Sequence, residues 1–159
     1  MNFVSTPMPE TIRFFRNEVK FRLSGATLIR PWLSKVARKE GRRIGELNYI
    51  FCTDEYLLDM NREHLGHDYY TDIITFDLSE GKRRKIASAE PIIGDIYISV
   101  DRVKENAESY GVSFIVELRR VMVHGLLHLT GYKDKTKAEK AAMRLKEDAY
   151  LSLLDGKRG

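Results

Sequence analysis

The sequence predicts a single α+β domain in which a mixed sheet of about four strands packs against about five helices. Four short stretches are rich in β-branched and aromatic residues, which favour strands, and five longer stretches repeat apolar residues at helical spacing. The predicted order along the chain is β-α-β-α-β-β-α-α-α. The 159 residues contain no internal repeat and no long linker rich in Pro, Gly or Ser, so one domain is expected over 1–159.

The first half of the chain predicts two strands and two helices. Residues 11–21 (TIRFFRNEVKF) alternate imperfectly, which favours an extended segment, and residues 26–41 repeat apolar side chains at helical spacing before a closing glycine. The segment ELNYIFC (46–52) predicts a strand. Thr53 has a side chain suited to capping a helix, and the predicted helix that follows, 54–65, begins with two acids where the helix dipole favours negative charge.

The second half predicts two more strands and three helices. Strands are expected at TDIITFDL (71–78) and PIIGDIYISV (91–100), separated by a polar connection. Helices are expected at 99–111, 112–131 and 136–156. The helix at 112–131 is apolar on nearly all sides, so we expect it to be central and buried.

Charge and cysteine content narrow the class of protein. The net charge is +4 and the sequence pI about 9.1, with basic residues gathered in 12–22, 37–43 and 81–85. Such a surface attracts polyanions, nucleic acid above all, although a solvated basic surface gives the same composition. No apolar run approaches the roughly 20 residues that cross a bilayer, and the first residues show no secretory pattern. A single cysteine, Cys52, allows no internal disulfide and no cysteine-based zinc site, which favours the cytoplasm, and we expect it in the core.

The stretch HGLLHLTGYKD (124–134) predicts a metal site. His124 and His128 are one helical turn apart, so their side chains share a face of the helix about 5–6 Å apart. Gly131 suits the left-handed end of a helix, after which the chain can double back and bring Asp134 to the same point. Two histidines and a carboxylate are accepted zinc ligands, and they leave one tetrahedral position open, as catalytic sites do.

Two alternatives stay open at this point. Histidines within a helix are also satisfied by hydrogen bonds alone, without a metal. The spacing is also close to the metzincin protease pattern HExxHxxGxxH, whose third ligand can be Asp. In those proteases the glutamate acts as the general base, and Gly125 stands in its place here, which argues against peptide hydrolysis.

Three segments together resemble one family. HGLLHLTGYKD (124–134) resembles the HGxLHLxGYDH signature of the YbeY family, bacterial single-strand-specific endoribonucleases of ribosomal RNA maturation. MNREHLGHDYYTDIITF (60–76) is similar to the family segment LNxxYRxxDxxTDVLSF, and IIGDIYIS (92–99) to its strand LGDIxIS. The segments follow the family's order, and the resemblance extends over about residues 11–154.

The resemblance implies a function and a ligand set. The protein would be a zinc-dependent endoribonuclease that matures ribosomal RNA, including the 16S 3′ end, and takes part in ribosome quality control. Its partners would be single-stranded RNA and the ribosome, with no membrane. One zinc ion, or another divalent metal, would be held by His124, His128 and Asp134, and a metal-activated water would cleave the phosphodiester.

The chain departs from the family pattern at two places. The third ligand position holds Asp134 in place of histidine, preceded by Lys133 in place of aspartate. Carboxylate remains a competent ligand, although the metal preference can shift. The family arginine falls on Leu65, so we predict that Arg62 or His67 contacts the substrate in its place, while a plain surface role is the alternative for each.

Other residues of the matching segments have less specific predicted roles. Three tyrosines are candidate stacking surfaces for bases, and three aspartates are candidates to orient a ligand histidine. They are Tyr69, Tyr70 and Tyr132, and Asp72, Asp77 and Asp95. The competing functions are a metzincin-like metalloprotease without the usual glutamate, and a non-catalytic RNA- or ribosome-binding factor with a structural metal.

Overall fold

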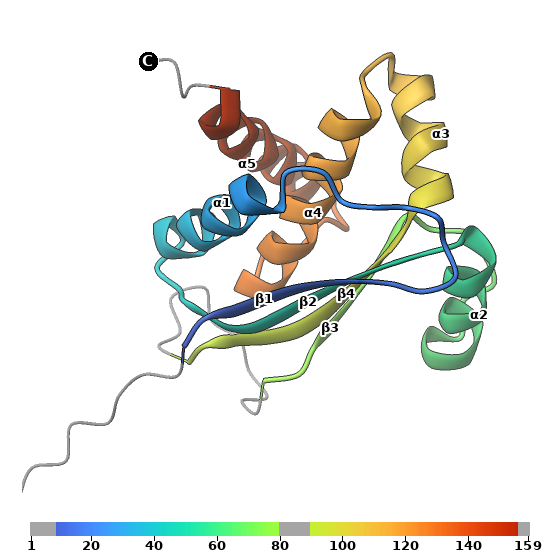
Figure 1. Cartoon of the computed structure of the whole chain (residues 1–159), viewed down its shortest axis with the longest axis horizontal. Helices are drawn as coiled ribbons and strands as arrows, with labels where there is room; N and C mark the ends of the chain where they lie inside the picture. The colour runs from blue at the N-terminus through green and yellow to red at the C-terminus, as the bar shows by residue number, and fades with distance from the viewer. Residues whose placement is uncertain (1–8, 80–89, 156–159) are drawn as a thin grey trace, which may run out of the picture.

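The computed structural model describes residues 9–79 and 90–155, which form one four-stranded sheet and five helices (Figure 1). The α+β class and the element order are those predicted from the sequence. The strands are β1 (Thr11–Arg16), β2 (Ile44–Cys52), β3 (Ile73–Asp77) and β4 (Ile92–Ser99). The helices are α1 (Ala26–Lys39), α2 (Asp54–Leu65), α3 (Val100–Tyr110), α4 (Phe114–Thr130) and α5 (Lys137–Asp155).

The sheet is mixed and has the order β1-β2-β4-β3. β1 and β4 run parallel to β2 on either side of it, and β3 pairs antiparallel with β4. β2 and β4 are therefore the central strands, and their alternate buried side chains form the floor of the core.

One face of the sheet carries α1, α4 and α5, with α4 in the middle (Figure 1). Two glycines allow α4 to lie close against the strands. A Cβ atom added at Gly125 would lie 2.9 Å from Cδ1 of Ile73 and 3.0 Å from Cδ1 of Ile96. A Cβ at Gly94 would lie 2.8 Å from Cδ1 of Leu129. A larger side chain at either position would force its neighbours to shift.

The opposite face of the sheet is covered at one end by α2 (Figure 1). A small apolar cluster joins them, built on Cys52, Leu57 and Ile74. Cys52 is fully buried, and burial raises the pKa of its thiol to about 12, so its predicted place in the core is confirmed. Within residues 9–79 and 90–155, no helix combines the length and apolar character needed to cross a membrane.

Most predicted elements are confirmed to within one or two residues, and the burial of α4 is confirmed as well. The extended segment predicted over 11–21 is too long: β1 ends at Arg16. The backbone N–H of Asn17 still reaches the carbonyl of Phe51 at 2.8 Å, but Glu18 takes a left-handed conformation with φ 56° that ends the strand. The predicted basic segment 81–85 lies outside the described residues.

Candidate metal centre

His124 and His128 lie near the end of α4, and the turn that follows the helix brings the carboxylate of Asp134 close to them. Gly131 has φ 118°, a conformation that favours glycine, and its N–H bonds the carbonyl of His128 at 3.0 Å. The N–H of Tyr132 bonds the carbonyl of Leu127 at 3.1 Å, which closes the helix end. The chain then reverses, and Asp134 lies over the last two turns of the helix as predicted.

Three side-chain atoms converge at this point. Oδ2 of Asp134 lies 3.2 Å from Nε2 of His124 and 3.4 Å from Nε2 of His128. The two Nε2 atoms are 2.9 Å apart, and one ligand atom from each residue lies within 4.8 Å of the others. Tetrahedral zinc ligands at the usual bond lengths stand about 3.3 Å apart, so the donor atoms already have the spacing that one small cation requires.

The outer nitrogens of both imidazoles are occupied. Nδ1 of His124 lies 2.6 Å from Oε2 of Glu147, and Nδ1 of His128 lies 2.9 Å from the carbonyl oxygen of Tyr132. Both partners are acceptors, so each Nδ1 carries the hydrogen and each Nε2 presents its lone pair to the common point. This arrangement, together with the carboxylate, fits a metal ion.

A buried carboxylate on α5 orients His124. Glu147 is only 7% exposed, and its second oxygen accepts a hydrogen bond of 2.9 Å from Arg120 on α4. Arg120 also pairs with Asp148 at 2.7 Å. Because the buried charge of Glu147 has both a guanidinium and an imidazole as partners, it ties α5 to α4 beside the metal centre.

A second buried carboxylate supports His128 indirectly. Glu40, at the end of α1, accepts hydrogen bonds from the hydroxyls of Tyr132, at 2.6 Å, and Tyr150, and from Lys146 at 3.0 Å. These contacts fix Tyr132, whose carbonyl holds His128. The residue that caps α1 and a residue of α5 therefore each position one of the two histidines.

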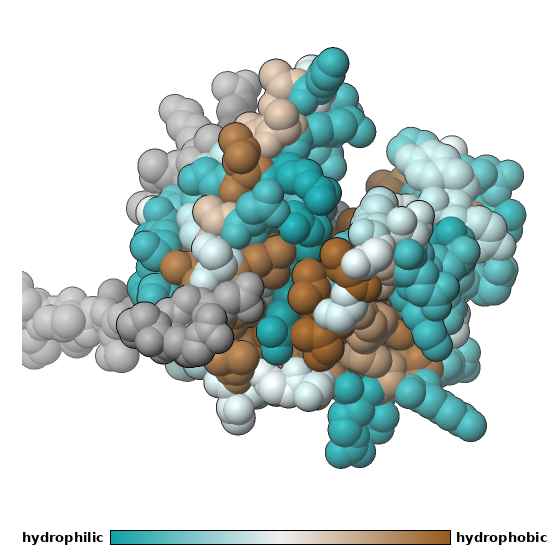
Figure 2. Space-filling model, turned by 90° about the horizontal axis from the view of Figure 1, so that it is seen from above, coloured by the Kyte–Doolittle hydropathy of each residue, from teal (hydrophilic) through white to brown (hydrophobic). Residues whose placement is uncertain are grey.

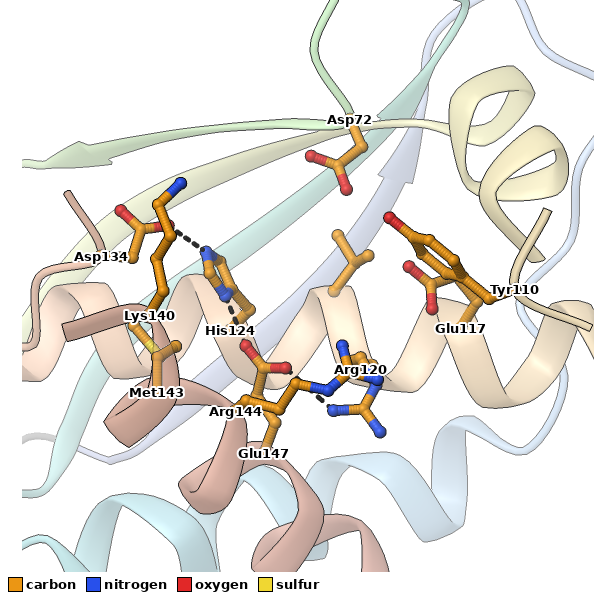
Figure 3. A pocket seen from close by; sticks show the side chains of 11 residues that line it. Asp72, Tyr110, Glu117, Arg120, His124, Asp134, Lys140, Met143, Arg144 and Glu147 are labelled. Carbon is orange, nitrogen blue, oxygen red and sulfur yellow. Dashed lines mark hydrogen bonds and ion pairs between the residues drawn. The ribbon is translucent and has the colours of Figure 1, made fainter. Parts of the chain in front are cut away.

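The candidate metal centre opens into a cavity of about 450 Å³ between α3, α4 and α5. Seen from above the helices, the molecule is hollowed between two lobes, and hydrophilic residues gather along one of the two facing rims (Figure 2). Figure 3 shows the side chains that converge on the cavity. They are Asp72, Tyr110, Glu117, Arg120, Val121, His124, Asp134, Lys140, Met143, Arg144 and Glu147.

The acids of the cavity shift one another's protonation. Burial lowers the pKa of His124, but the hydrogen bond and charge of Glu147 outweigh it and bring the pKa above its ordinary value of 6.5. The charge of Asp134 adds to the effect. Burial raises the pKa of Asp72 and, with help from the Asp72 charge, that of Glu117. The interior of the cavity is thus rich in carboxyl groups that are costly to ionise together.

The segment 60–76 contributes little to this cavity. Of its predicted functional residues, only Asp72 lines the cavity. Arg62 lies on the surface, 2.5 Å from Asp68, and His67 stacks on the exposed ring of Tyr69. The prediction that Arg62 or His67 contacts the substrate stays a prediction, and any such contact would lie outside the cavity.

The other stacking and orienting candidates have local partners. Tyr70 donates to Glu55 at 2.7 Å. Asp77 accepts from Ser79 in a turn, and Asp95 accepts from Asn48 at 3.0 Å. None of the three candidate aspartates hydrogen-bonds a ligand histidine; Glu147 and the Tyr132 carbonyl do.

Sequence reasoning missed Glu147 and Glu40. A signal for Glu147 was present, since it lies on the inward stripe of α5 with Met143 and Tyr150, where an acid needs a partner. Glu40 follows the last residue of α1 among exposed basic residues, and nothing in its sequence context marks it as buried.

Two histidines and a carboxylate converge, and two of the three, His124 and Asp134, line an open cavity on an α+β scaffold; this is the organisation of a metalloenzyme. Comparison with known proteins narrows the class. The family model described as Endoribonuclease YbeY matches residues 12–155. The chain therefore belongs to the YbeY family of endoribonucleases, as the sequence motifs indicated.

Individual relatives agree with this assignment. The Endoribonuclease YbeY of Cytophaga hutchinsonii is 58% identical over 144 residues, which cover 91% of this chain and 96% of the relative. That of Flavobacterium psychrophilum is 46% identical and covers 91% and 97%. The solution structure of TM1509 from Thermotoga maritima matches with a TM-score of 0.60 at 28% identity, covering 92% of this chain and 90% of that one.

Proposed function

We propose that this protein is a zinc-dependent, single-strand-specific endoribonuclease that acts in the cytoplasm on ribosomal RNA. Its substrates would include the 16S 3′ end, its partner would be the ribosome, and it would serve rRNA maturation and ribosome quality control. One domain over 1–159 would carry the activity. Membership of the YbeY family supports the nuclease chemistry, and the cavity beside the candidate metal centre supports the site.

One observation carries the proposal: Nε2 of His124, Nε2 of His128 and Oδ2 of Asp134 converge while both Nδ1 atoms are held by acceptors. A hydrogen-bonded pair of structural histidines has no need of a carboxylate returned to its inner face. We therefore assign these three residues as the metal ligands.

A cation held there would supply a Lewis acid that activates water and polarises a phosphoryl oxygen. The chain's own contribution is orientation. Glu147 keeps the inner nitrogen of His124 free of hydrogen, and the Tyr132 carbonyl does the same for His128. The side chains of the cavity wall would then determine how the RNA strand binds.

Packing argues against the metalloprotease alternative. The metzincin glutamate would stand at position 125, where even a Cβ would come within 2.9 Å of Ile73 and 3.0 Å of Ile96. That side of α4 faces the sheet, away from the cavity. A general base therefore has no room at this position, which supports nuclease chemistry rather than peptide hydrolysis.

The test combines metal analysis with cleavage of single-stranded RNA. We expect the natural protein to retain about one zinc per chain and to cut RNA, and His128→Ala to do neither. The matched control is His64→Ala, which removes an exposed histidine near Phe76 and should change neither property. Equal cleavage by His128→Ala would overturn the assignment. RNA binding that survives chelation, with no cleavage under any metal, would instead support the non-catalytic binding factor.

A further inference from the structure

The cavity poses a charge problem for an anionic substrate. Among the described residues that line it, four carry carboxyl groups: Asp72, Glu117, Asp134 and Glu147. A phosphodiester bound beside His124 and Asp134 would lie in a cavity lined by these carboxyl groups. Some cation of the cavity wall has to offset the repulsion.

Three cations line the cavity, and one of them is already committed. Arg120 bonds Glu147 at 2.9 Å and Asp148 at 2.7 Å, so its guanidinium serves the network that orients His124. Lys140 and Arg144 differ from it. Among the described residues, neither has a carboxylate within ion-pair distance, and both are exposed.

The two cations occupy one stripe of α5. Residues 140 and 144 are i and i+4, about 6 Å apart along the helix axis, and the same stripe carries Met143 and Glu147. In Figure 3 both side chains extend from α5 along the wall, Lys140 toward Asp134 and Arg144 toward Arg120. Because Glu147 on this stripe bonds His124, the stripe has a fixed position beside the candidate metal centre.

Hydrogen bonds also fix the start of α5. The hydroxyl of Thr136 accepts from the N–H of Glu139 at 3.0 Å, and Oε1 of Glu139 accepts from the N–H groups of Thr136, at 2.9 Å, and Lys135, at 3.1 Å. This reciprocal cap fixes the turn that connects Asp134 to α5. The backbone N–H of Lys140 bonds the carbonyl of Thr136 at 2.9 Å, so Lys140 belongs to this first turn of α5.

We propose that Lys140 and Arg144 bind the backbone phosphates of the RNA strand in the cavity, beside the metal centre. Their ammonium and guanidinium groups are free to make charge-assisted hydrogen bonds to phosphate oxygens, the guanidinium in a bidentate manner. The strand then lies along α5, with one phosphate brought to His124 and Asp134. This inference rests on the proposed function and adds to it the residues that hold the substrate.

The test compares two double variants of equal charge. Lys140→Met with Arg144→Met removes the cavity cations but keeps apolar stems. Lys104→Met with Arg38→Met removes one exposed lysine on α3 and one exposed arginine on α1, neither of which lines the cavity. Binding of a fluorescent single-stranded oligoribonucleotide is measured by anisotropy, in chelator, across a salt series.

We expect the cavity variant to bind at least about tenfold more weakly than the natural protein. The slope of log affinity against log salt should fall in magnitude by about 1.4, as for two lost phosphate contacts to a single strand. The control variant should change less in both measures. With metal added, the cavity variant should retain as much zinc as the natural protein and cut with a raised KM.

Equal losses in the two double variants would overturn the inference, because binding would then follow overall charge. Unchanged binding by the cavity variant would overturn it too, while cleavage by the natural protein would leave the proposed function standing. A natural protein that neither binds nor cuts RNA would overturn both.

Discussion

The ends of α2 and α4 use the same local device with different results. Each helix stops at a glycine with positive φ, Gly66 at 66° and Gly131 at 118°. In each case an acid just beyond folds back onto the helix. Asp68 reaches Arg62 at 2.5 Å, and Asp134 reaches His124 at 3.2 Å.

Burial separates the two. At the end of α2 both partners are more than half exposed, with side-chain exposures of 51% for Arg62 and 76% for Asp68, so water screens their attraction. At the end of α4 the side chains of His124 and His128 are only 21% and 24% exposed, and Glu147 of α5 bonds the first of them. A local turn can return an acid to a helix, but a second element packed on it is needed to turn the cluster into a site.

The largest expected difference between the two helix ends, in zinc affinity and RNA cleavage, comes from removing the acid that folds back onto each helix. Asp134→Ala should lower zinc affinity by more than about 100-fold and abolish cleavage. This loss exceeds the one typical when a residue that only hydrogen-bonds a metal ligand is removed. Asp68→Ala, the matched change on α2, should leave both within error. Zinc competition against a chromophoric chelator and RNA cleavage measure the two. Full zinc affinity in Asp134→Ala would show that the turn after Gly131 supplies no ligand.

Removing the acid that orients a ligand should have the next largest effect. Glu147→Ala leaves Nδ1 of His124 without its acceptor, and we expect zinc affinity to fall about 10–100-fold and the free energy of unfolding by about 2 kcal/mol. Glu55→Ala on α2 removes an exposed acid that accepts from Tyr70 and serves as the control. Chelator competition and urea unfolding are the measurements. If both variants behave alike, Glu147 does not position His124.

The buried Glu40 should make stability depend on acid pH. Burial raises its pKa, but hydrogen bonds from Tyr132, Tyr150 and Lys146 outweigh this, so the folded pKa lies below the ordinary 4.5. The carboxylate therefore contributes its full stability above pH 4.5, and the contribution is lost as pH falls through the folded pKa.

We expect Glu40→Gln to be about 1–2 kcal/mol less stable than the natural protein at pH 7. The difference should shrink steadily below pH 4.5. Urea unfolding of the metal-free proteins at several pH values tests this. A constant difference across pH would show that the charge of Glu40 contributes nothing beyond its hydrogen bonds.

The smallest effect is expected at the exposed end of α2. Arg62→Ala should change RNA affinity by less than about threefold, because its guanidinium is already paired and lies outside the cavity. Anisotropy with the same oligoribonucleotide measures it. A loss as large as that of the Lys140→Met, Arg144→Met variant would show instead that the strand continues over α2 and contacts Arg62.

Local chain geometry explains what could be predicted in advance. The spacing of His124 and His128, the helix end at Gly131 and the return of Asp134 depend on residues within eleven positions of one another. Helical periodicity and capping residues likewise placed most helices and strands. The end of β1 is the exception among the predicted boundaries. It depends on the left-handed backbone at Glu18, which the residue types of the segment do not predict.

The sequence by itself therefore determined the α+β class, the order of the elements and the convergence of His124, His128 and Asp134. Only the tertiary structure decided that Glu147 and Glu40 orient the histidines, that Lys140 and Arg144 face the cavity, and that Arg62 does not. The physical reason is the separation along the chain of the residues that interact. Backbone geometry fixes relations within a few turns, whereas contacts between α1, α4 and α5 depend on how their apolar faces pack on one sheet.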